Sequence, residues 1–153
     1  MIKKIKKLWH WLPIIWKDED WDYVYFLEIM RHKLISMRGF FNSDQTVTLY
    51  SKNRAEEMEI CIKILNRLIA DEYHINTHIF HNKKWGDIEI DFISINDKYN
   101  EMVSNRKKVK TEKDKEQEKK EFLKCMEQGE YLKKQDIQYL GKLLTRHLRK
   151  WWD

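Results

Sequence analysis

The chain has 153 residues, of which 42% are hydrophobic and 36% charged, with 4 glycines, 1 proline and a formal net charge of +5. This length is typical of one domain with one core, and so few breakers argue against an all-β fold rich in tight turns. We therefore expect a mainly α protein, a compact helical bundle that forms a single domain over residues 1–153.

The cysteines and the N-terminus indicate the compartment. Cys61 and Cys125 form no CxxC pair, so the sequence supports neither a zinc nor a redox motif, and two thiols suit a reducing cytosol. The apolar stretch Leu8–Trp16 follows four lysines, but it is too short to span a bilayer and no small-residue cleavage site follows it. The sequence predicts a cytoplasmic protein without a membrane span.

The first 17 residues hold five lysines and no acid. Apolar residues with helical spacing predict a basic amphipathic segment that Pro13 ends, and they are Ile2, Ile5, Leu8, Trp9 and Leu12. One interpretation is docking on a membrane surface or a partner. The other, which we favour because the segment is short, is packing against the protein's own core.

Two further helices are predicted with clear apolar stripes. The first follows the acids of residues 18–22, with Asp18 or Asp20 as its N-cap, and closes near Gly39; its stripe is Leu27, Met30, Leu34, Met37 and Phe41. The second covers residues 52–73, and its stripe includes Met58, Cys61, Leu65 and Leu68.

The pattern changes after residue 74. Ile88, Ile90 and Phe92 alternate with acids, which predicts a short β-hairpin around residues 75–95, although a helix from Asp87 stays open. A charged helix is expected over 96–128, with residues 104–121 as a solvated helix or hairpin arm. After Gly129, a last helix over 134–152 carries the stripe Ile137, Leu140, Leu144, Leu148 and Trp151.

Enzyme signatures are lacking. The sequence contains no GxxxxGK[ST], GxGxxG, GxSxG or HExxH motif, so we assign no catalytic residue and no cofactor, and we favour a binding protein over an enzyme. His74, His78 and His81 have a spacing that could hold a metal on a helix. We favour core-edge histidines and assign no metal.

The tryptophans are more suggestive, because seven exceed what a domain of this size needs. They are Trp9, Trp11, Trp16, Trp21, Trp85, Trp151 and Trp152, mostly beside basic residues. Either they stack on a base or another flat anionic ligand while Lys or Arg takes its phosphate, or they seal a junction between the two chain ends. Asp22 and Lys33 lie along one strip of the second predicted helix and could line a polar pocket.

The run from Trp16 to Leu27, WKDEDWDYVYFL, followed by Lys33-Leu34 and by the final Trp151-Trp152-Asp153, resembles small proteins encoded by bacteriophages. The likeness covers the two ends of the chain and leaves the middle unmatched, and His32 beside the lysine departs from the usual pattern. It implies a viral origin and a compact helical fold, and it implies no reaction. On this basis the shared residues of interest are Trp21, Asp22, Lys33, Trp151, Trp152 and Asp153.

These observations lead to a stoichiometric binding protein that sequesters an anionic host ligand, such as a nucleotide immune signal, in the host cytoplasm. The expected ligand-binding residues are Trp21, Asp22, Tyr25, Lys33, Trp151 and Trp152. Alternatives are a nucleic-acid-binding protein that uses the basic stretches 1–17 and 106–120, an inhibitor of a host protein, or a metal-dependent nucleotide hydrolase with His74 and His78. A homo-oligomer stays open.

Overall fold

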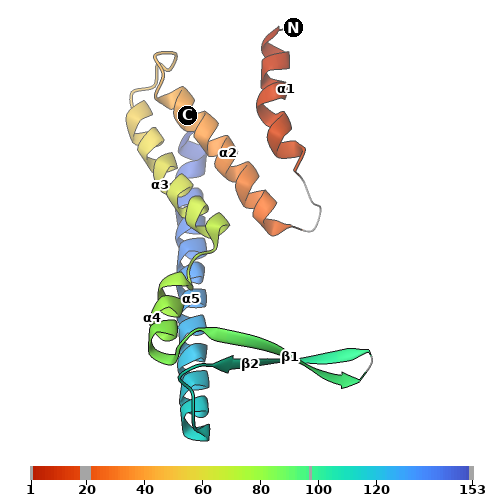
Figure 1. The fold of residues 1–153 in the computed structure, drawn as a ribbon. Coiled ribbons are helices and arrows are strands. Elements are labelled where there is room, and N and C mark those ends of the chain that lie inside the picture. The colour runs from red at the N-terminus through yellow and green to blue at the C-terminus, as the bar shows by residue number, and fades with distance from the viewer. Residues whose placement is uncertain (1, 18–21, 97, 152–153) are drawn as a thin grey trace. The chain divides into compact units, whose positions relative to one another are not determined.

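The structure is a computed structural model that describes residues 2–17, 22–96 and 98–151, with side chains except at positions 2–4 and 7. The described residues form five α-helices, a two-stranded antiparallel sheet and a final 3-10 helix (Figure 1). The expectation of a mainly α fold with a short β-hairpin is confirmed. The chain divides into two compact units: unit 1 is residues 1–71 with 135–153, and unit 2 is residues 72–134.

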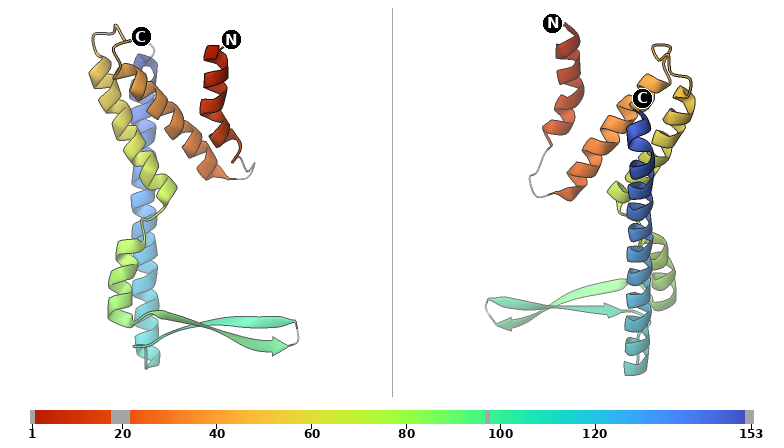
Figure 2. Two further views of the ribbon diagram at one scale, coloured as in Figure 1. Left: turned by 45° about the horizontal axis from the view of Figure 1, so that its top comes forward. Right: turned by 180° about the vertical axis from the view of Figure 1, so that it is seen from behind.

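Unit 1 is built on helices α2 (Tyr23–Phe41) and α3 (Ser51–Ala70), which run side by side in opposite directions (Figure 2). The stripe predicted for α3 is its packed face, with Met58, Cys61 and Leu65 fully buried. Polar contacts tie the same helices at their edge, since Arg38 pairs with Glu59. The core of unit 1 also includes Leu34, Phe41, Ala55, Ile62, Ile64, Leu68, Leu140 and Trp151.

Helix α1 (Ile2–Ile15) runs two residues past Pro13, so the prediction that Pro13 ends this helix is wrong. Proline lacks only its own N–H, and the next turn still closes through the bond from Trp16 N–H to the Leu12 carbonyl at 2.9 Å. The predicted apolar stripe is not the face that packs, because Leu8 and Trp9 are exposed, by 62% and 68%.

The α1 face that contacts α2 carries aromatic rings instead. His10 and His32 have ring centroids 4.3 Å apart, and Trp11 meets His32 edge-on at 4.8 Å. His10 Nε2 also lies 2.7 Å from the hydroxyl of Ser36. Burial, and after it the neighbouring His10, hold the pKa of His32 below its usual value of 6.5.

Unit 2 combines α4 (Ile75–Trp85), the hairpin and the first part of α5 (Glu112–His147). Glu121 on α5 accepts from Lys84 Nζ at 2.6 Å and from the indole N–H of Trp85 at 2.8 Å. These bonds, with a third from Gln117, hold the pKa of Glu121 down at about 2. One carboxylate thus fixes the end of α4 to α5.

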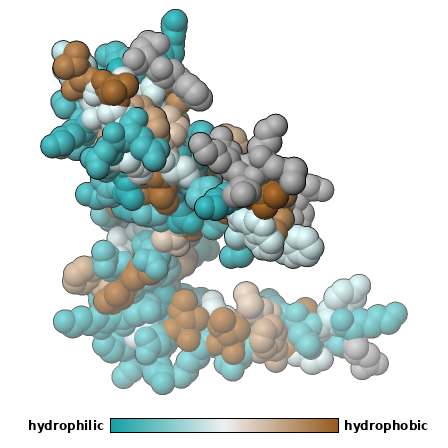
Figure 3. All heavy atoms as spheres, turned by 90° about the horizontal axis from the view of Figure 1, so that it is seen from above, coloured by the Kyte–Doolittle hydropathy of each residue, from teal (hydrophilic) through white to brown (hydrophobic). Residues whose placement is uncertain are grey.

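The hairpin consists of β1 (Ile88–Asn96) and β2 (Tyr99–Arg106). The strand predicted from the alternation at Ile88 is present, but residues 75–85 are helical and residues 99–106 are a strand where a helix was expected. The register places Ile88, Ile90, Phe92 and Met102 on one face of the ribbon, because cross-strand partners share a face. This exposed face is apolar, and Figure 3 shows such side chains in a row along the arm.

Helix α5 is continuous through Gly129, so the predicted break at this glycine is wrong. The reason for the glycine is close packing in unit 2 rather than a turn. A Cβ at this position would lie 2.0 Å from Nδ1 of His74, well inside any real contact distance. Gly141 on the same helix has open space instead.

These two glycines generate a matched pair of variants. Gly129→Ala gains up to about 1 kcal/mol of helix propensity but must displace the His74 ring, which costs about 1–3 kcal/mol, so we expect net destabilisation. Gly141→Ala has only the gain, so we expect it to be neutral or stabilising. Chemical denaturation followed by circular dichroism measures both. Equal stability changes in the two variants would contradict the packing argument.

The contact of His32 with α1 predicts a dependence on pH. Because the pKa of His32 is lowered in the folded state, the unfolded chain takes up a proton first as the pH falls through 6.5. The contact therefore weakens on acidification and is strongest when His32 is neutral. Amide protection factors in α1 should fall between about pH 7.5 and 5.5, and His32→Gln should flatten this response. An unchanged response in the variant would remove His32 as its cause.

Candidate functional site

The end of α2 and the segment that connects it to α3 enclose a cavity of about 430 Å³ in unit 1. Two of the expected ligand-binding residues, Lys33 and Trp151, line this cavity. They come from opposite ends of the chain, from α2 and from the 3-10 helix Leu148–Trp151. The remaining lining residues are Ser36, Met37, Phe40, Phe41, Gln45, Thr46, Val47, Thr48 and Arg54.

The connecting segment forms because α2 stops at Phe41. Asn42 closes the helix, and the Ser43 hydroxyl donates to the Phe40 carbonyl at 2.7 Å. The hydroxyls of Thr46 and Thr48 then lie 3.0 Å apart on the lining. Residues 46–48 are irregular, and residues 49–50 form a turn. The segment supplies the hydrogen-bonding groups of the cavity.

Arg54 is the lining residue that the sequence reading missed. Its guanidinium carbon lies 5.8 Å from the ring centroid of Phe41, a cation–π distance. It belongs to the first turn of α3, which has no acid and no side-chain cap. A cation is disfavoured at a helix N-terminus, but Lys52 shares this turn and does not line the cavity, so the local sequence does not single out Arg54.

The charges of the cavity are of one sign. Lys33 and Arg54 are its cationic lining residues, and the lining given by the described residues contains no carboxylate. Neither cation forms an ion pair with a described residue. The cavity therefore combines two uncompensated positive charges with aromatic rings and hydroxyls, which suits an anionic ligand with a flat apolar part.

Trp151 forms part of the wall and has little surface left for stacking. Its side chain is buried, with 2% of the residue exposed, and its indole N–H donates to Glu57 at 2.9 Å. This is a packing role with its polar atom satisfied. The ring with exposed area on the lining is Phe40, which contacts Phe41 edge-on.

Asp22 and Tyr25 do not line this cavity. Asp22 is the N-cap of α2, where its Oδ1 accepts from the Val24 N–H at 2.8 Å. Asp18 and Asp20, the predicted caps, lie outside the described residues. Tyr25 is on the first turns of α2, about 12 Å along the helix axis from Lys33, and it does not line the cavity. Trp21, Trp152 and Asp153 also lie outside the described residues.

The tryptophans among the described residues have different surroundings. Trp85 is buried, as is Trp151, and each donates its N–H to a glutamate. Trp9 and Trp16 are exposed, and Trp11 contacts His32 on α2. Among the described residues, the indoles are thus distributed over separate contacts. Packing explains the two that are buried.

The thiols and the histidine triplet are in packed surroundings. Burial, and then the charge of Glu57, raise the pKa of Cys61 to about 11, so this thiol stays protonated. His78 and His81 both meet the ring of Phe122 edge-on, and His74 lies against Gly129. Within the described residues, no three His, Cys, Asp or Glu side chains are grouped as they would be around a metal ion.

Comparison with known proteins gives no relative. No protein-family model, no curated protein and no solved structure matches this chain. Among the described residues, no helix is both long enough and apolar enough to cross a membrane. The site must therefore be interpreted from its own geometry.

Variants of Asp22 distinguish its role as a helix N-cap from a role in contacting the ligand. As an N-cap, Asp22→Ala should lose about 1 kcal/mol of unfolding free energy, and Asp22→Ser should keep most of it. Ligand affinity should stay unchanged, because Asp22 is about 16 Å along the helix from Lys33. Urea denaturation and calorimetry measure the two quantities. A variant of normal stability with weakened binding would instead show that Asp22 contacts the ligand.

Proposed function

We propose that this protein is a stoichiometric binder that sequesters an anionic small molecule of nucleotide type in the unit 1 cavity. The observation that carries the proposal is the pair of uncompensated cations, Lys33 and Arg54, on a lining without carboxylates. In this arrangement Lys33 and Arg54 bind the phosphate, the exposed ring of Phe40 contacts the base, and the Thr46 and Thr48 hydroxyls hydrogen-bond its polar edge. A volume of about 430 Å³ is in the range of small-molecule sites.

The biological setting of the proposal comes from the resemblance to bacteriophage proteins. A phage protein that captures a nucleotide in the host cytoplasm would lower the concentration of a host immune signal. It would act in proportion to its own amount, since each cavity holds one molecule. The ligand is then a host nucleotide, and its release from the protein in unchanged form is expected.

Nucleic-acid binding is the weaker candidate, because part of the basic stretch 106–120 is already engaged. Arg106 is buried and paired with Glu118. Lys107 pairs with Glu89 at 3.1 Å, and Lys108 donates to the Lys83 carbonyl. The described residues add no observation that favours a metal-dependent hydrolase or a particular host protein.

Titration calorimetry with AMP and adenosine tests the proposal. We expect saturable binding of AMP at one site per chain, and adenosine at least about tenfold weaker because it lacks the phosphate. The double variant Lys33→Gln/Arg54→Gln should lose at least about tenfold in AMP affinity. Lys52→Gln/Lys142→Gln removes two positive charges from exposed positions of unit 1 outside the cavity, and it should bind AMP normally.

A second measurement covers ligands other than AMP. Heat denaturation of the purified protein should release an anionic compound that copurified with it. Mass spectrometry should identify this compound as unmodified. Failure of both AMP and a cyclic dinucleotide to bind, with no copurified anion, would overturn the proposal. Equal losses in Lys33→Gln/Arg54→Gln and in Lys52→Gln/Lys142→Gln would mean general charge attraction, and this result would also overturn the proposal.

A further inference from the structure

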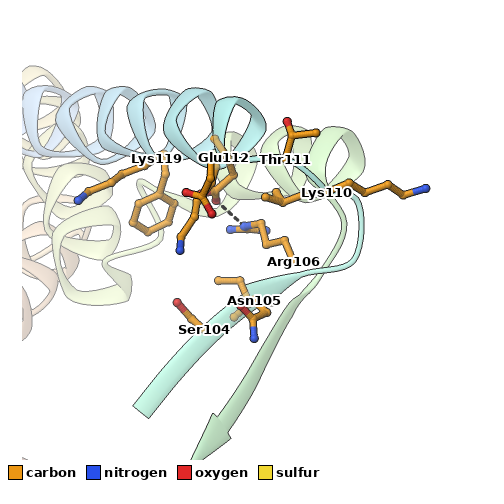
Figure 4. A pocket seen from close by; sticks show the side chains of 12 residues that line it. Ser104, Asn105, Arg106, Lys110, Thr111, Glu112 and Lys119 are labelled. Carbon is orange, nitrogen blue, oxygen red and sulfur yellow. Dashed lines mark hydrogen bonds and ion pairs between the residues drawn. The ribbon is translucent and has the colours of Figure 1, made fainter. Parts of the chain in front are cut away.

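Unit 2 contains a second charged cavity, which is separate from the proposed function. It has a volume of about 520 Å³ and lies where the end of β2 meets the first turns of α5 (Figure 4). Arg106, the last residue of β2, points from the strand toward α5 in this view. Its side chain is 95% buried, with 5% exposed.

Three contacts hold the Arg106 guanidinium in place. Nε donates to Glu118 at 2.5 Å, and Nη1 donates to both the Asn82 side chain and the Gly86 carbonyl at 2.7 Å. These bonds join the hairpin to α4 and α5, so Arg106 has a structural role. They leave Nη2 buried and without an acceptor among the described residues. A buried guanidinium nitrogen without an acceptor is costly, and it marks a place for an additional oxygen atom.

Three lysines contribute to the lining of the same cavity, and in Figure 4 the ends of Lys110 and Lys119 point away from Arg106. Lys110, Lys115 and Lys119 line it, and none of them forms an ion pair with a described residue. Lys115 and Lys119 are one turn apart on α5, where like charges repel. The carboxylates on the lining are Glu112 and Glu118, and Glu118 is already paired with Arg106. The cavity therefore has an excess of positive charge.

One wall of the cavity is apolar. Ile88 and Phe122 line it, and Ile88 belongs to the exposed apolar face of the hairpin with Ile90 and Phe92. The face continues outward from the cavity along the arm. A ligand that places an anionic group beside Arg106 would thus have an apolar surface next to it.

We propose that this cavity binds a phosphate ester with an apolar body. The phosphoryl oxygens accept from Arg106 Nη2 and attract the ammonium groups of Lys115 and Lys119, which turn toward the bound anion, and Ser104 supplies a hydroxyl donor on the same lining. The apolar body lies against Ile88 and Phe122. The site differs from the unit 1 cavity in its residues, and either site can exist without the other.

Phenyl phosphate and inorganic phosphate are suitable probes, used with the full-length ¹⁵N-labelled chain at constant ionic strength. Phenyl phosphate should shift the amide signals of residues 104–122 with saturation, and it should bind about tenfold more tightly than inorganic phosphate because the ring is buried. Lys115→Gln/Lys119→Gln should weaken binding at least about tenfold. The matched control Lys113→Gln/Lys120→Gln removes the same charge from α5 outside the lining and should bind normally.

The background variant Lys33→Gln/Arg54→Gln separates this proposal from the function proposed for unit 1. In that variant, the shifts of residues 104–122 should persist. Shifts confined to unit 1 residues would overturn the unit 2 site and leave the unit 1 proposal standing. The unit 2 proposal would also be overturned if both lysine-pair variants lost phenyl phosphate affinity equally, or if phenyl phosphate did not saturate the shifts below about 10 mM. Arg106→Lys tests the anchor, and it should weaken binding while circular dichroism reports that the chain is folded.

Discussion

The apolar face of α3 is the contact on which unit 1 depends. Met58, Cys61 and Leu65 are completely buried, and a buried Met or Leu side chain contributes about 1.5–3 kcal/mol to folding before the entropy cost. Packing on α2 fixes where that helix ends and where α3 begins. The connecting segment between Phe41 and Ser51 therefore has fixed ends, and the cavity lined by it follows from this packing.

Two arginines show how differently the protein uses the same side chain. Arg106 is buried with a carboxylate and two neutral acceptors, so most of its hydrogen-bonding capacity stabilises unit 2. Arg54 has only the face of Phe41 and no ion pair with a described residue. Because a guanidinium presents five donors, Arg54 retains many for a ligand, whereas Arg106 retains the few on Nη2. This difference favours unit 1 as the main binding site.

The sequence predicted the parts of the fold that periodicity encodes. The stripes of α2 and α3 appear where spacings of three and four placed them, and the strand beginning at Ile88 follows from its alternation. Long-range contacts caused the errors. Gly129 looks like a helix break until His74, far away in sequence, occupies the space that a side chain would need. Pro13 and strand β2 were misjudged because local propensity was weighed without the neighbouring turn and the pairing strand.

The candidate site was predictable only in part, because long-range contacts bring most of its residues together. Lys33 and Trp151 were selected from motifs at the two chain ends, and the fold places both on one cavity. Asp22 was selected with them, but its carboxylate caps the helix that it precedes. Arg54 and the two threonines carry no motif, since they become neighbours only when the connecting segment folds. Lys52 shares the first helical turn of α3 and lies outside the cavity, so no local sign distinguished Arg54.

The composition of the unit 1 lining also bears on whether the protein binds its ligand or transforms it. General acid–base catalysis needs a group that exchanges protons near neutral pH, most often His, Asp or Glu. Nucleophilic catalysis needs a hydroxyl or thiol beside such a base. The described lining has hydroxyls at Ser36, Thr46 and Thr48 and no His, Asp, Glu or Cys of its own, but Nε2 of His10 lies 2.7 Å from the Ser36 hydroxyl. Because that hydroxyl donates its hydrogen to the His32 carbonyl at 3.1 Å, it has no proton left to give to His10 in this arrangement. For the proposed binding function, a phosphate held by Lys33 and Arg54 would meet charge and hydrogen bonds, which is the arrangement that capture requires.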